Sequence, residues 1–151
     1  MPVRGARETS GALRELARYV GTPLTAASRF ALQPTLTTAK RNVRSIPFED
    51  STGALEASLT IRKKGGGSGL NITTQVGPSA GFQRFAGTSA GKFGFRQPAR
   101  YAHLLEFGTV HFAPKPFLTP AFLNTQGQVV KRFGDRIGTE MEKRAAKLRK
   151  R

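Results

Sequence analysis

Residues 55–77, LEASLTIRKKGGGSGLNITTQVG, decide the β part of the fold. Apolar and polar residues alternate over 55–62 and again over 70–76. A period of two is typical of a strand with one face buried. The glycine-rich run between the two segments, KKGGGSG at 63–69, has the residues of a flexible hairpin loop. This stretch therefore predicts an antiparallel hairpin.

Upstream of the hairpin, the sequence predicts a helical arm over residues 1–45. Its first helix has apolar residues at spacings of three and four, and Gly21 is expected to end it. Thr22 and Pro23 follow in the order of an N-cap and a first helical proline, so a second helix is expected there. Pro34 is expected to kink or end that helix, and a third, weaker helical piece follows.

Residues 79–98, SAGFQRFAGTSAGKFGFRQP, show no periodicity and are interpreted as a long loop. Phenylalanines and basic residues are interleaved in it, with Arg84, Lys92 and Arg96 inside and Arg100 just beyond. This mixture suits the stacking of single-stranded bases or a subunit interface, and both alternatives stay open. In either case we expect the loop to become ordered against a partner.

Two helices are expected in the last third of the chain. A short helix over 99–107 is ended by Gly108, and Thr119-Pro120 begins a long helix over 120–148. The apolar positions of the long helix recur at three and four residues, and at 1.5 Å per residue it would be roughly 43 Å long.

The expected fold class is α+β. It comprises the helical arm at 1–45 and an α+β unit at 46–151, together one structural domain. In the second unit a small antiparallel sheet with the hairpin at 55–77 is followed by the short helix at 99–107. The long C-terminal helix is expected to pack on the sheet.

The charge of the chain is strongly positive. Twenty-five Lys and Arg face nine Asp and Glu, a formal net charge of +16, and such a surplus favours a polyanionic partner or a place in a larger assembly. Hydrophobic residues make up 38%, so we expect a thin core that neighbouring subunits help to cover. The candidates for facing DNA or a subunit interface are Arg84, Lys92, Arg96, Arg100, Lys147, Arg149, Lys150 and Arg151. No groove-reading helix is recognisable, so contacts would be to phosphate, without sequence preference.

The sequence predicts no enzyme and no catalytic, cofactor or metal site. The absence of cysteine excludes disulfides and thiolate chemistry. His103, Glu106 and His111 lack a further carboxylate for a metal site, and the glycines at 65–69 lack the Gly-Lys-Ser/Thr ending of a phosphate loop. No apolar stretch is long enough for a membrane span and no signal peptide is recognisable, so we expect a soluble protein without a membrane partner.

Three segments together resemble one protein family. PFEDSTGALEASLTIR (47–62) resembles its approach to the first strand, with one additional residue between Asp50 and Thr52. TQVGP (74–78) resembles the end of its second strand, and YAHLLEFGTVHFAPKPFLTPA (101–121) resembles its most specific block. The family is the tail-component group of tailed bacteriophages typified by the HK-ninety-seven gp-ten-like proteins, called head–tail joining or tail-completion proteins. The residues that carry the resemblance are Asp50, Thr52, Gly53, Leu55, Tyr101, Glu106, Gly108, Thr109, Pro116, Phe117 and Pro120.

The resemblance implies a structural virion protein of the head–tail interface, or neck. Such a subunit would be assembled in the bacterial cytoplasm as a ring, expected to be a hexamer, and would complete the tail or join it to the head connector. Its partners would be its own copies, the connector or stopper, the tail tube or terminator, and genomic DNA passing through the lumen.

The resemblance also implies a structural role for Glu106. We expect it to form a hydrogen bond or ion pair with backbone or an arginine, because an unpaired buried carboxylate would be costly.

The alternative is a small basic nucleic-acid-binding protein that acts outside a particle. Salt distinguishes the two, since binding to phosphates weakens steeply with salt whereas assembly through apolar contacts does not.

Overall fold

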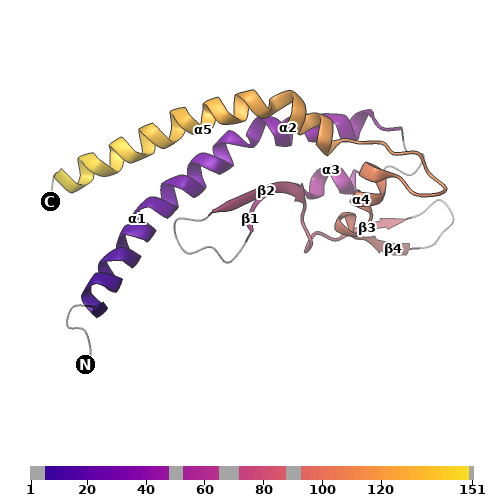
Figure 1. The fold of residues 1–151 in the computed structure, drawn as a ribbon. Coiled ribbons are helices and arrows are strands. Elements are labelled where there is room, and N and C mark those ends of the chain that lie inside the picture. The colour runs from indigo at the N-terminus through magenta and orange to yellow at the C-terminus, as the bar shows by residue number, and fades with distance from the viewer. Residues whose placement is uncertain (1–5, 48–52, 65–71, 88–92, 150–151) are drawn as a thin grey trace.

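The computed structural model describes residues 6–47, 53–64, 72–87 and 93–149. Two long helices and a shorter one form one layer, and two small hairpins with two short helices lie against one part of it (Figure 1). Helix α1 begins and helix α5 ends toward the same side of the molecule (Figure 1). The expected α+β class is confirmed.

The arm forms helices α1 (Ala6–Ala31) and α2 (Gln33–Ser45). The predicted break at Pro34 is confirmed: Leu32 separates the helices, and Pro34 stands in the first turn of α2, where its missing N–H costs least. The predicted stop at Gly21 is wrong, because α1 continues through Gly21 and Pro23. Pro23 is fully buried, so packing against the rest of the fold overrides the local signals to stop.

The predicted hairpin is confirmed for residues 59–64 and 73–78. Strands β1 (Leu59–Lys64) and β2 (Thr73–Pro78) pair antiparallel, with Ile61 opposite Val76. The predicted strand over 55–58 is wrong, because Ala54–Ser58 forms the short helix α3. Helical spacing buries Leu55 and Ser58 and leaves Ala57 exposed, whereas a strand would have put Leu55 and Ala57 on one face.

The loop expected over 79–98 contains a second hairpin. Strands β3 (Arg84–Gly87) and β4 (Phe93–Arg96) pair antiparallel, with Phe85 opposite Phe95 and Arg84 opposite Arg96. Four-residue strands show too little alternation to be distinguished from a loop by pattern. The prediction of an irregular segment is therefore wrong at these positions.

The two C-terminal helices are confirmed as α4 (Pro98–Phe107) and α5 (Leu118–Arg149). Helix α5 runs antiparallel to α1 and α2, and these two helices are its main packing partners (Figure 1). The long helix thus packs chiefly on the helical arm, whereas the expectation placed it on the sheet.

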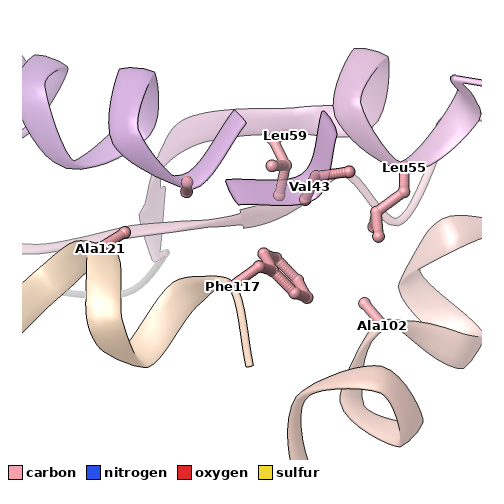
Figure 2. Packing of buried hydrophobic residues seen from close by; sticks show 7 residues of the cluster. Val43, Leu55, Leu59, Ala102, Phe117 and Ala121 are labelled. Carbon is pink, nitrogen blue, oxygen red and sulfur yellow. The ribbon is translucent and has the colours of Figure 1, made fainter. Parts of the chain in front are cut away.

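The core is small and lies where α2, α3, α4, β1 and the start of α5 meet. Phe117 is its largest side chain and points toward Val43, Leu55, Leu59 and Ala102 (Figure 2). Because Ala39 and Val43 of the arm belong to this cluster, the arm shares one core with the remainder of the chain. Arg44 of α2 also forms an ion pair with Glu56 of α3.

Candidate functional site

The Glu106 carboxylate joins the two halves of the 101–121 block. Glu106 lies in the last turn of α4 and is buried, with 9% of its surface exposed. Its Oε2 accepts hydrogen bonds from the backbone N–H groups of Phe117 and Leu118, both at 2.9 Å, and its Oε1 accepts one from Thr119 at 2.7 Å. One carboxylate therefore satisfies three N–H groups that the start of α5 leaves without a helical partner. Of the partners expected for Glu106, backbone or an arginine, the structure shows backbone.

The electrostatics of Glu106 follow from this geometry. Burial acts to raise the pKa of Glu106, but hydrogen bonds from the Thr119 hydroxyl and from the N–H groups of Leu118, Phe117 and Thr119 lower it, and the net pKa lies below its ordinary value. The carboxylate also lies at the positive end of the α5 dipole. Its acceptor oxygens are used within the chain, so the arrangement serves as a structural clamp between α4 and α5.

The segment between the two halves is fixed by backbone contacts. Gly108 ends α4 with a φ of 77°, and a Cβ there would lie 2.8 Å from the carbonyl oxygen of Phe112, so glycine is required. The N–H of Thr109 donates to the same Phe112 oxygen at 2.9 Å, and the N–H of Lys115 donates to Leu105 O at 2.8 Å. The predicted end of the short helix at Gly108 is confirmed.

Phe117 anchors the connection in the core. It is 1% exposed, and Asn42 of α2 donates a side-chain hydrogen bond to its carbonyl oxygen at 2.9 Å. Leu55 is buried beside it and Tyr101 packs against the same cluster. Pro116 is exposed and Pro120 is half-buried in the first turn of α5.

The first resemblance segment is only partly described. Asp50 and Thr52 lie outside the described residues. Gly53 adopts a left-handed conformation with a φ of 64°, and it precedes helix α3, not the strand that was expected. Its carbonyl accepts the N–H of Ala57 at 3.0 Å, which starts that helix.

The predicted basic candidates within the described part of the chain lie on different elements. Arg100 is exposed on α4. Arg84 and Arg96 face each other in the register of β3 and β4, and Lys147 and Arg149 belong to the last turns of α5, but the side chains of all four lie outside the description. Lys92, Lys150 and Arg151 lie outside the described residues.

An apolar groove that the sequence analysis missed runs between β2 and α5. Two adjoining cavities of about 320 and 340 Å³ form it, and both are lined by Leu32 and Thr74. The Thr74 hydroxyl is 2.8 Å from that of Ser28, which ties β2 to α1. The α5 side of the groove is lined by Phe122, Leu123, Val129, Val130 and Phe133.

The α5 residues of the apolar groove remain partly uncovered. Leu123 is 56% exposed and Val130 is 73% exposed. Phe122, Val129 and Phe133 of the apolar groove belong to the apolar stripe that the sequence predicted for the long helix. Leu123 and Val130 lie outside that stripe, so the sequence did not indicate the two most exposed residues of the groove.

The described part of the chain contains no group of three or more His, Cys, Asp or Glu residues placed to hold a metal ion. His103 and His111 are both exposed, and the Glu106 carboxylate is bound by backbone amides. None of the described helices is long and apolar enough to span a membrane.

No family model, no curated protein and no solved structure matches the chain.

Proposed function

We propose that the chain is a structural subunit of the head–tail interface of a tailed phage or phage-like particle. It would assemble as a ring, with a hexamer expected, that completes the tail or joins it to the head connector and lets DNA pass. The observation that carries the proposal is the Glu106 clamp. It connects the Tyr-Ala-x-x-x-Glu-x-Gly-Thr and Pro-x-Pro-Phe-Leu-x-Pro-Ala halves of the resemblance as one unit.

The apolar groove favours a protein that assembles with other subunits over a nucleic-acid-binding protein that acts alone. A core of this size leaves large apolar side chains exposed along α5, and contiguous exposed apolar surface is typical of interaction sites. In a ring, each copy offers one surface and receives another from its neighbour. We propose the apolar groove as one of these two surfaces.

The location of the protein tests the proposal directly. Gold-labelled antibody against the chain, applied to particles from the producing cells, should mark the junction of head and tail. Label along the tail tube, label on the capsid alone, or the absence of label from particles would contradict the assignment. The last result, combined with DNA binding by the free chain, would favour a small basic nucleic-acid-binding protein.

The role of the apolar groove in assembly can be tested with two neighbouring substitutions on α5. Leu123→Asp places a charge in the apolar groove and should abolish rings in negative-stain micrographs. Asn124→Asp is the matched control, because Asn124 is also exposed but lies outside that groove. Equal loss of rings in both variants would contradict this use of the groove.

A further inference from the structure

A second groove lies between α2 and α5, and its lining is polar. It encloses about 510 Å³, and its exposed polar side chains include Gln33, Thr37 and Arg41 from α2 and Asn124, Gln128 and Arg132 from α5. No Asp or Glu lines it. We call it the polar groove.

The two arginines lie toward opposite ends of the polar groove. Thr35 of α2 and Thr125 of α5 mark where the helices meet, because their hydroxyl oxygens are 2.7 Å apart. Arg41 lies C-terminal to Thr35 on α2, and Arg132 lies C-terminal to Thr125 on α5. Because the two helices run in opposite directions, the arginines lie on opposite sides of this contact (Figure 1). At 1.5 Å per residue, their positions are separated by about 20 Å along the helix axes.

Arg132 is held in place without a carboxylate. Its guanidinium lies over the ring of Phe30, 5.4 Å from the centroid, and that of Arg136 lies 5.3 Å from the same centroid. Arg136 forms an ion pair with Glu140 at 3.0 Å. Neither Arg132 nor Arg41 has an acidic partner within the described part of the chain.

The chemistry of the lining matches a chain of phosphates. Guanidinium and amide groups are among those that donate to phosphate oxygens in nucleic-acid complexes, whereas acidic groups would repel them. Adjacent phosphates on one strand of B-form DNA rise about 3.4 Å along the axis, and the strand winds as it rises, so 20 Å of groove spans at most about six steps. The groove is open to solvent, which suits a strand better than an enclosed small molecule.

We propose that the polar groove binds the phosphodiester backbone of nucleic acid, with Arg41 and Arg132 as its two charged contacts. The proposal of a phage neck protein does not depend on this site, because other basic residues were the candidates for facing DNA there. Because the lining of the polar groove offers no pattern for reading bases, we expect equal binding to duplexes of different sequence.

The test is the salt dependence of DNA binding by the full chain. Anisotropy of two labelled duplexes of unrelated sequence is measured between about 50 and 200 mM salt. The double variant Arg41→Gln, Arg132→Gln should make the negative slope of log K against log salt shallower by about 1.8, and should lower the affinity near 0.1 M by roughly 60-fold. The double variant Lys63→Gln, Lys64→Gln is the matched control, since both lysines are exposed and neither lines the groove.

A second pair of variants separates the groove from total charge. Gln128→Glu puts a negative charge in the groove, whereas Gln126→Glu puts the same charge on an exposed position of α5 outside its lining. Only Gln128→Glu should weaken binding, and urea unfolding should show that both variants fold.

The proposal is overturned if the wild-type chain fails to bind either duplex at low salt, if groove and control variants lose binding equally, or if one sequence is strongly preferred. None of these results changes where the antibody label lies on particles, so failure here is distinguishable from failure of the neck assignment.

Discussion

The two grooves beside α5 differ in chemistry although they share one helix. Leu123 lines the apolar groove and Asn124, the next residue, lines the polar groove. Successive residues of a helix are about 100° apart around its axis, so a single step along the sequence moves a side chain from one groove to the other. The helix therefore offers a surface suited to another protein and a surface suited to DNA.

The boundary between the two grooves is a buried hydrogen bond. Thr125 donates its hydroxyl hydrogen to the carbonyl of Ala121 at 2.7 Å, so Thr35 donates to Thr125. Thr35 is 1% exposed and Thr125 is 6% exposed. This bond joins α2 to α5, with Thr35 lining the apolar groove and Thr125 lining the polar groove.

The largest effect is expected at the start of α5, where Glu106 binds Leu118 and Thr119 of the apolar groove. Glu106→Ala leaves three N–H groups without their acceptor and should lower the free energy of unfolding by about 3 kcal/mol. Urea unfolding measures this change, and Glu142→Ala on the exposed face of α5 is the control. Similar losses in the two variants would contradict the role of the clamp.

Acid should weaken the same clamp. The pKa of Glu106 is lowered in the folded chain, so the unfolded state binds more protons and stability rises with pH in this range. The contribution is present above the ordinary value of 4.5 and is lost as pH falls through the folded pKa. Unfolding measured at a series of pH values should show this loss in the wild type and a smaller one in Glu106→Gln. An identical pH dependence in both would assign the titration to another group.

A smaller effect is expected at the boundary between the grooves. Thr125→Val leaves the buried Thr35 hydroxyl without its acceptor and should cost about 2 kcal/mol. Thr35→Val combined with Thr125→Val removes both hydroxyls and should cost less than the sum of the two single changes. Additive costs in this double-mutant cycle would show that the two hydroxyls act independently.

The smallest effect is expected at Phe30. Phe30→Leu keeps an apolar side chain but removes the ring beneath Arg132 and Arg136, a contact worth about 0.5–1 kcal/mol at an exposed site. DNA affinity should fall by roughly two- to fivefold, because Arg132 is then less well positioned. Anisotropy titration measures it, and unchanged affinity would remove Phe30 from the account of the polar groove.

The parts of the fold that local patterns specify were predictable from the sequence. The end of α4 at Gly108 and the start of α5 near Pro120 both depend on residues close to them in the sequence. The helical α3 and the β3–β4 hairpin were missed because elements of four or five residues carry too little periodicity. The continuation of α1 through Gly21 depends on packing that no local pattern contains.

The two grooves could not be predicted because distant segments form them. The apolar groove needs β2 to lie beside α5, and the polar groove needs Arg41 and Arg132 on antiparallel helices. The sequence indicated a surplus of charge and an apolar stripe, but it did not indicate which arginines share a surface. The candidates named from charge density near the C-terminus are different residues from the two that line the polar groove.

The most direct test measures assembly and DNA binding on the same two variants, Leu123→Asp and Asn124→Asp. Sedimentation velocity with and without a short duplex reports both properties in one experiment. We predict that Leu123→Asp loses self-assembly and keeps DNA binding, whereas Asn124→Asp keeps self-assembly and loses affinity for DNA. If both variants lose the same property, or if neither loses any, the two sides of α5 do not serve two different partners.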